Sequence, residues 1–352
     1  ILEIDPEART AVVEPGVILN TLNREANRQQ LQFGPDPASA ERATLGGSLA
    51  NNASGAHSIL YGLAVDHLLA ADVILSDGSS ARWAQQSLAS ARYQAAQPGI
   101  HAQILRMALD IRDQRADAIR STWPATWRRV SGYNLNYLLP WSPSQPPLWA
   151  EHCVAWQNPG AAPLPYPPIP SGEINLAALF AGSEGTLALL HKATLRLVPR
   201  PGHTALGVLS FPGIAQACDA VPEILRFRPS AVELIPYSLV RLARNVPAYA
   251  HLVSFVDQFA TYHSADSALL VVEFSGTDPL ALRGQVLALG KDVWLAEKPD
   301  AQKNVWAIRK VGLGILMSQQ GAAKPIAFIE NIAVPVDRLG EFVRAVESIL
   351  SE

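Results

Sequence analysis

ATLGGSLANNASGAHSILYG, residues 43–62, is rich in Gly, Ala, Ser and Asn, is nearly free of charge and has no amphipathic period. Residues without large side chains let the main chain approach a ligand closely, and the adjacent Gly46 and Gly47 leave N–H groups that can point at it. Short hydrogen-bonding side chains with little bulk are supplied by Thr44, Ser48, Asn51, Asn52 and Ser54. The stretch fits either an ordinary loop or a cradle for a phosphate or pyrophosphate.

Composition limits the class of protein. A chain of 352 residues, 49% apolar and 17% charged, suits two folded domains and excludes extensive disorder. The net charge is −3 with scattered Lys and Arg, so no nucleic-acid partner is indicated. Cys153 and Cys218 lack metal-site or disulfide spacing, which favours a reducing cytoplasm. No apolar run approaches the ~20 residues of a transmembrane segment, and no signal peptide is expected.

Apolar periodicity predicts the elements of the first part of the chain. Short strands are expected at 1–4 and 10–13, a helix at 17–29, and two strands within 67–83 joined at Asp77 and Gly78. From 85 to 123 the period is helical. Between 140 and 170 the many prolines exclude helix and predict a surface excursion or linker.

The second part alternates strands and helices. A half-buried strand or hairpin is expected within 186–201, and the punctuation at 199–202 marks a domain boundary. Strands are then expected at 205–211, 268–274 and 325–334, and helices at 215–227, 238–244, 279–289, from 302 and from 336. This order predicts an α+β architecture of helices packed on a sheet. The chain begins without Met in a strand pattern and stops in a helical one, so we expect a piece of a longer protein.

The order of motifs carries a family resemblance. PDPAS, ATLGGSLANNASG, YG, SDG and GSEGTLALLHKATLRLVPRP together resemble the FAD-binding domain of the vanillyl-alcohol oxidase and p-cresol methylhydroxylase (PCMH) superfamily. The resemblance is closest to the FAD-linked D-2-hydroxy acid dehydrogenases, the group that includes the FAD-linked component of glycolate oxidase and the D-lactate and D-2-hydroxyglutarate dehydrogenases. SAVELI, VWAIRKVGLGILM and AKPIAFIENIAVPVDRL are similar to that group's C-terminal substrate domain.

The resemblance implies the fold and the domains. Residues 1–200 are expected to form part of a PCMH-type FAD-binding domain, with a helical and Pro-rich insertion at about 86–172. Residues 201–352 are expected to form part of an α+β, ferredoxin-like FAD-linked oxidase C-terminal domain. The family's upstream lobe, with a glycine-rich loop resembling RGGGTS, is not in this sequence. Half of the FAD cradle is therefore expected here, the fragment alone is expected to be inactive, and its retention of FAD is left open.

The resemblance also implies the cofactor site. The residues expected to wrap the FAD diphosphate are Pro35, Ala43, Thr44, Gly46, Gly47 and Ser48. Those expected beside the flavin end are Asn51, Asn52, Ser54 and Gly55, and those near the isoalloxazine and its sugar-like chain are Gly182, Gly185 and Thr186. Within GSEGT, the Glu184 carboxylate is expected to accept backbone N–H bonds that hold the turn.

A carboxylate clamp is implied for a small 2-hydroxy acid substrate. An Arg from the family's WxxRK helix matches Arg309, and a later Lys matches Lys324. The planar guanidinium can bind a carboxylate through two nitrogens. From the residues alone, solvated charges at helix ends are the favoured interpretation of both, and the family resemblance reverses this for Arg309 more firmly than for Lys324. The implied reaction passes a hydride from the hydroxyl-bearing carbon to flavin while a base takes the hydroxyl proton.

The base is not found among the histidines. Family members carry it in a motif of the HxGDGNxH type downstream of the IEN/AVP strand, so it is expected beyond Glu352. The isolated histidines of this sequence, which also give no metal-binding pair, are His57, His67, His101, His152, His191, His203, His251 and His263. For His57, in the small-residue loop, a local hydrogen bond is the favoured role.

One departure points to the electron acceptor. SGYNLNYLL, residues 131–139, is separated from GSEGT by the Pro-rich stretch and INLAALFA, as in large family members fused to an iron–sulfur domain. An iron–sulfur domain or a quinone is therefore a candidate acceptor, and a peripheral membrane location is an alternative to a purely cytoplasmic one. Two hypotheses stay open: an FAD-dependent D-2-hydroxy acid dehydrogenase, or a non-catalytic scaffold of the same fold.

Overall fold

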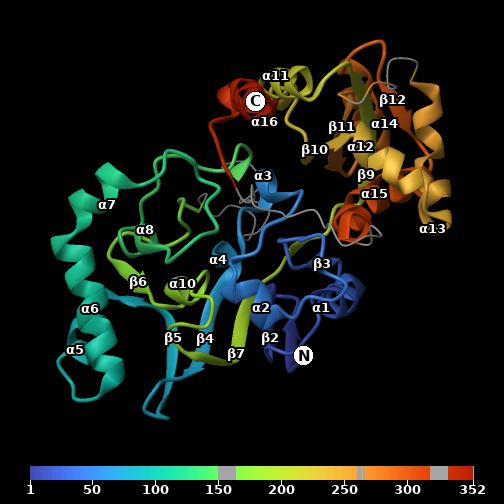
Figure 1. The fold of residues 1–352 in the computed structure, drawn as a ribbon. Coiled ribbons are helices and arrows are strands. Elements are labelled where there is room, and N and C mark those ends of the chain that lie inside the picture. Colours follow the sequence, from blue (N-terminus) through green and yellow to red (C-terminus); the bar gives the residue numbers. More distant parts are fainter. Residues whose placement is uncertain (150–163, 260–263, 265, 318–331, 352) are drawn as a thin grey trace. The chain divides into compact units, whose positions relative to one another are not determined.

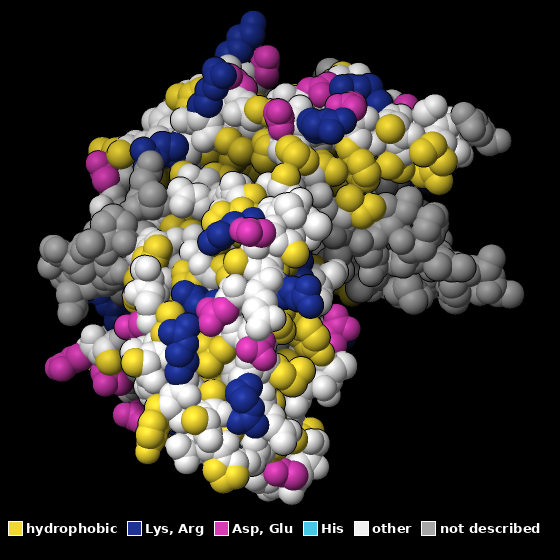
Figure 2. Space-filling model, turned by 90° about the vertical axis from the view of Figure 1, so that its left-hand side faces the viewer, with side chains coloured by type: hydrophobic (Ala, Val, Ile, Leu, Met, Phe, Trp, Pro, Cys, Tyr) yellow, Lys and Arg dark blue, Asp and Glu magenta, His cyan; other side chains and the backbone are white. Residues whose placement is uncertain are grey.

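The structure, a computed structural model, describes all residues except 150–163, 260–263, 265, 318–331 and 352. Two compact units make up the chain, Ile1–Arg200 and Pro201–Glu352 (Figure 1). Each mixes helices with a sheet and is described by itself below. On the face shown in Figure 2, the described Lys and Arg side chains are interspersed with Asp and Glu.

A six-stranded antiparallel sheet organises the first unit. Its strands are β1 (Glu3–Asp5), β2 (Thr10–Val13), β4 (Leu68–Ile74), β5 (Ser80–Ser87), β6 (Glu173–Asn175) and β7 (Leu189–Arg196). The strand order is β1-β2-β7-β4-β5-β6, so β7 lies between strands that come much earlier in the chain. A two-stranded sheet, β3 (Leu31–Gln32) with β8 (Val198–Pro199), is separate.

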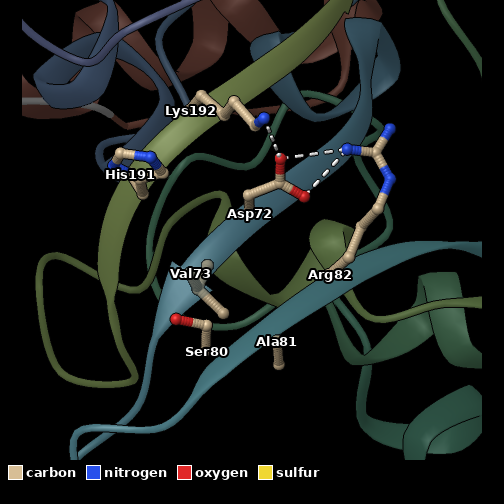
Figure 3. Close-up of a pocket in the computed structure, with 7 residues that line it drawn as sticks. All are labelled: Asp72, Val73, Ser80, Ala81, Arg82, His191 and Lys192. Carbon is tan, nitrogen blue, oxygen red and sulfur yellow. Dashed lines mark hydrogen bonds and ion pairs between the residues drawn. The ribbon is translucent and has the colours of Figure 1, made fainter.

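One face of the six-stranded sheet carries charged side chains. Arg82 Nη1 on β5 donates to both carboxylate oxygens of Asp72 on β4, at 2.8 and 3.0 Å, and Lys192 Nζ on β7 lies 3.3 Å from the same carboxylate (Figure 3). A cavity of about 270 Å³ opens here, lined by these residues with Val73, Ser80, Ala81 and His191. Alternation along the strands places polar side chains on this face.

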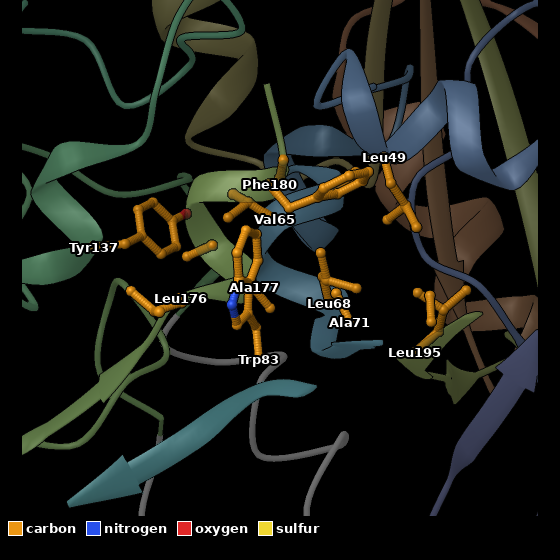
Figure 4. Close-up of a cluster of buried hydrophobic side chains, with 14 of the residues drawn as sticks. Leu49, Val65, Leu68, Ala71, Trp83, Tyr137, Leu176, Ala177, Phe180 and Leu195 are labelled. Atoms are coloured by element: carbon orange, nitrogen blue, oxygen red, sulfur yellow. The ribbon is translucent and has the colours of Figure 1, made fainter. Parts of the chain in front are cut away.

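The opposite face of the sheet carries the core. Trp83 on β5, Ala71 on β4 and Leu195 on β7 are each 2% exposed or less. Figure 4 shows Trp83 among Val65, Leu68 and Leu176. Burying a large aliphatic side chain contributes about 1.5–3 kcal/mol, so the many buried side chains of this cluster stabilise the unit.

Helices complete the first unit. They are α1 (Leu19–Ala26), α2 (Leu45–Ala50), α3 (Ser58–Tyr61), α4 (Ala64–His67), α5 (Leu88–Ala95), α6 (Ile100–Gln114), α7 (Ala116–Thr122), α8 (Leu135–Leu138) and α10 (Ala177–Phe180). The helix expected at 17–29 is α1 followed by a 3₁₀ turn, Asn27–Gln29. The helical pattern expected from 85 begins later, because Ser87 still ends β5 and caps α5 by accepting the Ser90 N–H at 3.1 Å.

The Pro-rich stretch is not simply a surface excursion, and that expectation is wrong for its described residues. Trp149 is 1% exposed, its ring contacts Tyr166 edge-on at 4.9 Å between centroids, and Leu148 is buried beside it. The indole Nε1 donates to the Leu164 and Pro165 carbonyls at 3.2 Å. The expectation that prolines exclude helix here is also wrong, because Trp149 is helical, and the apolar side chains between the prolines pack into a core.

A four-stranded antiparallel sheet organises the second unit. Its strands are β9 (His203–Phe211), β10 (Ala231–Pro236), β11 (Ala268–Gly276) and β12 (Trp294–Ala296), in the order β10-β11-β9-β12. α11 (Ile214–Leu225) follows β9, and α14 (Pro279–Ala288) follows β11. This βαββαβ succession with that strand order is ferredoxin-like, which confirms the expectation.

Helices cover both faces of this second sheet. Leu270, Val272 and Phe274 pack toward α11 and α14, whereas Leu269 and Val271 pack toward the other face. That other face is covered by α12 (Tyr237–Arg244), α13 (Pro247–Ala250), a 3₁₀ helix (His251–Gln258) and α15 (Pro299–Met317). A short 3₁₀ helix (Val336–Arg338) leads into α16 (Leu339–Ser351), which packs on α11. Most of the strand expected at 325–334 lies outside the described residues.

Candidate functional site

The backbone N–H groups of the glycines at the start of α2 form hydrogen bonds within the protein. Leu45 N–H donates to the Val17 carbonyl at 2.7 Å, and Gly46 N–H donates to the Pro15 carbonyl at 2.9 Å. Gly47 N–H donates to Thr44 Oγ1, the N-cap, at 3.3 Å. The expectation that the Gly46 and Gly47 N–H groups point at a ligand is therefore wrong. Gly46 is needed for close approach, because a Cβ there would lie 2.6 Å from Pro15 Cβ.

The turn after α2 is built around Asn52. This residue is fully buried and has a φ of 49°, a conformation that Asn tolerates better than most residues. Its Oδ1 accepts the Val65 N–H at 3.0 Å, and its Nδ2 makes a long 3.5 Å bond to the Arg129 carbonyl. Ala53 N–H turns back to the Ser48 carbonyl at 2.8 Å. These hydrogen bonds hold the small-residue turn in one conformation.

The PDP loop is joined to this turn through Asp36. Its carboxylate accepts the His57 N–H at 3.2 Å and lies 2.7 Å from His57 Nδ1. A Cβ on Gly55 would lie 2.1 Å from Asp36 Oδ1, so glycine is required where the loops cross. The local hydrogen bond favoured for His57 is present. These contacts connect the PDP loop, which contains Pro35, to the small-residue turn at residues 51–55.

GSEGT forms a turn with two successive left-handed residues. Glu184 has a φ of 50° and Gly185 of 80°, and Thr186 N–H donates to the Ser183 carbonyl at 3.0 Å, as in a type I′ turn. Thr186 Oγ1 donates to the same carbonyl at 2.6 Å. The Glu184 carboxylate is exposed and accepts no hydrogen bond from the residues that the structure describes. The expectation that it holds the turn is wrong, since backbone bonds do so.

The two glycine-containing motifs meet at the C-terminal end of α2. Gly182 N–H donates to the Leu49 carbonyl at 3.3 Å, and Glu184 N–H donates to the Ala50 carbonyl at 3.1 Å. Carbonyls in the last turn of a helix have no partner within the helix, so the GSEGT turn supplies one. Residues predicted near the diphosphate and residues predicted near the isoalloxazine are thereby hydrogen-bonded to each other.

Two glycines of this site are less crowded than the others, and one of them, Gly185, faces open space. A Cβ on Gly185 would meet nothing within 4 Å, and one on Gly47 would meet only Thr44 Oγ1, at 3.3 Å. The Gly185 N–H has no hydrogen-bond partner within the described part of the chain. Among the described residues, the buried hydroxyls of Ser48 and Ser183 have none either. Open backbone with short donors fits the phosphates and flat ring of FAD, which need close approach of the main chain.

An adjacent pair of buried ionisable residues follows the YG dipeptide. Asp66 accepts the Tyr137 hydroxyl at 2.5 Å and the Leu63 N–H at 2.8 Å, and burial raises the pKa of its carboxyl to about 7. His67 Nε2 donates to the Tyr61 carbonyl at 2.8 Å, and burial lowers the pKa of its imidazole to about 3. Neither residue was predicted from the sequence to have a role. The sequence feature that could have identified them is the presence of two polar residues inside the apolar run 59–71.

The predicted substrate arginine lies on α15, which covers one face of the second sheet. Arg309 Nε on α15 lies 2.9 Å from Glu233 Oε2 on β10, and both side chains are 21% exposed. It is therefore not a solvated charge at a helix end. One turn earlier, Trp306 Nε1 donates to the buried Glu273 carboxylate on β11 at 2.9 Å, and Ser230 Oγ donates to Glu273 at 3.2 Å. Lys324 lies outside the described residues.

Other features give no second candidate. The cavity beside Asp72 contains none of the predicted cofactor residues. Within the described ranges no three His, Cys, Asp or Glu side chains are grouped as a metal site would require. None of the described helices combines the length and apolar character needed to cross a bilayer.

Each of the two units contains a match to a known family. Residues 1–83 match the family described as FAD binding domain, and residues 200–352 match FAD linked oxidases, C-terminal domain. Among solved structures, alkyldihydroxyacetonephosphate synthase has a TM-score of 0.53 at 17% identity, covering 90% of this chain and 45% of that one. That likeness shows a shared fold.

Several relatives match along the whole chain, and two of them are described here. D-2-hydroxyglutarate dehydrogenase of Pseudomonas putida is 26% identical over 366 residues, covering 99% of this chain and 33% of that protein. D-lactate dehydrogenase of Archaeoglobus fulgidus is 24% identical over 353 residues, covering 100% of this chain and 58% of that protein. The chain thus spans about a third of the length of the first relative. With both domain families matched in this order, the chain belongs to the proteins that join an FAD binding domain to an FAD-linked oxidase C-terminal domain.

Proposed function

We propose that the protein is an FAD-dependent oxidoreductase that oxidises a D-2-hydroxy acid, of the lactate, glycolate or 2-hydroxyglutarate type, to the 2-oxo acid. The observation that carries this proposal is the junction at the end of α2, where the Gly182 and Glu184 N–H groups bind the Leu49 and Ala50 carbonyls. It brings the two expected flavin motifs into one site. The names of the whole-chain relatives support the substrate class.

In this proposal, the first unit is part of a PCMH-type domain whose insertion spans about 86–172. The diphosphate is held by Pro35, Ala43, Thr44, Gly46, Gly47 and Ser48, with Asn51, Asn52, Ser54 and Gly55 beside the flavin end and Gly182, Gly185 and Thr186 beside the ring system. FAD, when bound, supplies the hydride acceptor. The protein's residues supply close backbone approach at Gly47 and Gly185 and a rigid support behind them.

The substrate carboxylate is assigned to Arg309, with Lys324 as a second cation. The guanidinium is planar, so the edge near Glu233 and the edge formed by its terminal nitrogens face different directions. Glu233 forms an ion pair with the group at Nε, and the planar guanidinium suits a carboxylate of the substrate. In this role Arg309 orients the hydroxy acid and holds it in a fixed geometry for reaction.

Electrons must leave the flavin after each turnover. An iron–sulfur domain or a quinone is the proposed acceptor, and the two differ in a measurable way. An iron–sulfur domain in the full-length protein would give its own visible absorption and iron content, whereas a quinone acceptor would show as reduction of added quinone analogues with no iron present.

The test is the visible spectrum of the full-length protein purified with its flavin. Anaerobic addition of D-lactate, glycolate or D-2-hydroxyglutarate is expected to bleach the flavin band with at least one of them, and L-lactate and L-2-hydroxyglutarate serve as controls. Arg309→Met is expected to keep the flavin and to lose bleaching at low substrate concentration. A folded protein that binds no flavin would overturn the proposal and leave the scaffold alternative.

A further inference from the structure

The segment 128–134, RRVSGYN, touches both flavin turns of the first unit. Arg128 Nη2 donates to Ser54 Oγ at 3.2 Å in the small-residue turn. Tyr133 forms a 2.7 Å hydrogen bond with Thr186 in the GSEGT turn, at the other end of the segment. Between them, a Cβ on Gly182 would lie 2.8 Å from the Gly132 carbonyl. The segment therefore bridges the two turns as a third side of the same site.

The direction of the Tyr133 hydrogen bond is fixed by its neighbour. Thr186 Oγ1 lies 2.6 Å from the Ser183 carbonyl, which can only accept, so the threonine proton is directed there. Thr186 must then accept the Tyr133 hydroxyl proton at 2.7 Å. The phenol is held at its hydroxyl end by a chain of two bonds that ends on the GSEGT backbone.

The segment is also anchored from behind. Asn134, 2% exposed, donates through Nδ2 to the Ala181 carbonyl at 2.8 Å and to the Ala178 carbonyl at 3.3 Å. Arg129 Nη2 donates to the Tyr133 carbonyl at 2.8 Å, and its guanidinium lies 4.2 Å above the Trp123 ring. The backbone on both sides of Tyr133 is thus fixed.

Despite this support, the Tyr133 side chain is 38% exposed. Its hydrogen-bond partner Thr186 is exposed, and so is Gly185, whose missing side chain leaves open space. A rigidly held aromatic ring beside an open glycine backbone is a surface suited to another flat ring, since aromatic pairs stack or pack edge to face.

We propose that Tyr133 contacts the isoalloxazine of FAD and that the segment 128–134 is the third wall of the flavin site. This inference rests on the proposed function and deepens it. Contact by the ring is distinct from a purely local role, in which the hydroxyl would clamp the GSEGT turn and the ring would touch nothing. The two roles can be distinguished by variants. Removing only the hydroxyl would disturb the clamp, whereas removing the ring would also disturb contact with the flavin.

The test compares Tyr133→Leu and Tyr133→Phe in the full-length protein. FAD dissociation constants are measured by titration, and the fluorescence and visible circular dichroism of the bound flavin are recorded. Tyr133→Leu is expected to weaken FAD binding about tenfold, which is about 1.4 kcal/mol, and to raise the flavin fluorescence by removing the quenching ring. Tyr133→Phe is expected to bind within about threefold of the wild type and to keep the quenching, because the ring remains. The control is Tyr93→Leu, at a tyrosine of α5 that is 73% exposed, and it should change neither quantity.

Equal losses of affinity in the Leu and Phe variants, with an unchanged flavin spectrum, would overturn the contact and leave only the clamp. Wild-type affinity in Tyr133→Leu would also overturn it. If Tyr133→Leu does not fold, Tyr133→Trp decides: a changed flavin circular dichroism supports contact, and an unchanged one contradicts it. A folded wild-type protein that binds no FAD would instead overturn the proposed function itself.

Discussion

Glu233 on β10 and Arg309 on α15 form an ion pair of 2.9 Å between Oε2 and Nε, with each side chain only 21% exposed. A pair in this setting is screened less by solvent than a surface pair. It holds the predicted substrate arginine against the sheet. Its strength can be measured without reference to activity.

The coupling between Glu233 and Arg309 is expected to exceed that of a surface pair. A double-mutant cycle with Glu233→Gln and Arg309→Gln should give an interaction of about 1–2 kcal/mol in the free energy of unfolding. The control cycle uses Asp219 and Arg344, whose side chains are 49% and 53% exposed and whose pairing distance is 2.7 Å. We expect no more than about 0.5 kcal/mol there. Similar couplings for the two pairs would show that partial burial adds nothing.

Asp66 and His67 should give opposite pH dependences of stability. The folded Asp66 carboxyl binds a proton up to about pH 7 while the unfolded one releases it near 3.8, so its contribution falls as pH rises between these values. The folded imidazole of His67 stays neutral down to about pH 3, while the unfolded one binds a proton below 6.5. Its contribution therefore rises with pH over that window.

In the wild type these two slopes largely cancel between pH 3.8 and 6.5. Asp66→Asn should expose a free energy of unfolding that rises with pH, relative to the wild type, by up to about 1.4 kcal/mol per pH unit. His67→Gln should expose the opposite slope. Urea unfolding at several pH values checks both. Parallel curves for the two variants would contradict the assignment of opposite shifts.

Gly182→Ala is expected to be more destabilising than Gly78→Ala, although their φ values are 81° and 82°. The left-handed conformation alone costs a non-glycine residue about 1–2 kcal/mol. At Gly78 a Cβ meets nothing within 4 Å, whereas at Gly182 it would lie 2.8 Å from the Gly132 carbonyl. Thermal unfolding should therefore show a larger loss at Gly182, accompanied by weaker FAD binding. Equal losses would mean that the contact with Gly132 is relieved at no cost.

Trp149→Ala is expected to cost about 3–5 kcal/mol, as for other buried aromatic side chains. The indole is 1% exposed and loses contact with Tyr166 in this variant. Tyr93→Ala, at a 73% exposed position, should change the free energy of unfolding by less than about 0.5 kcal/mol. A small effect at Trp149 would restore the view of the Pro-rich stretch as a peripheral excursion.

Strand alternation and motif order predicted much of the fold. The expected strand at 10–13 is β2, and the expected strands at 205–211 and 268–274 lie within β9 and β11. The ferredoxin-like order of the second sheet came from the family resemblance, because periodicity does not specify which strands pair. The prediction of a surface excursion was wrong for the Pro-rich stretch because it was based on proline content. The burial of Leu148 and Trp149 depends on tertiary contacts, which proline content does not indicate.

Residue types in the sequence indicated which segments could form the candidate site, but they did not show how the backbone of these segments is hydrogen-bonded. Small residues marked Gly46, yet the sequence could not show that its N–H would meet the Pro15 carbonyl. GSEGT indicated a turn, yet the outward direction of Glu184 follows from its φ of 50°. Glu233 was missed, because a carboxylate in a strand has no local signal of the helix that later covers it. Arg309 was identified through the family motif alone.

The hydrogen bonds from Gly182 and Glu184 to the end of α2 have a consequence for biosynthesis. The helix leaves the ribosome long before the turn that binds its last carbonyls, because residues 51–181 are translated in between. Contacts between distant parts of a chain form late, since the intervening loop must first be closed. We therefore expect a nascent chain to acquire its helices early and to capture flavin only after β7 has emerged, so that cofactor loading reports completion of the first unit.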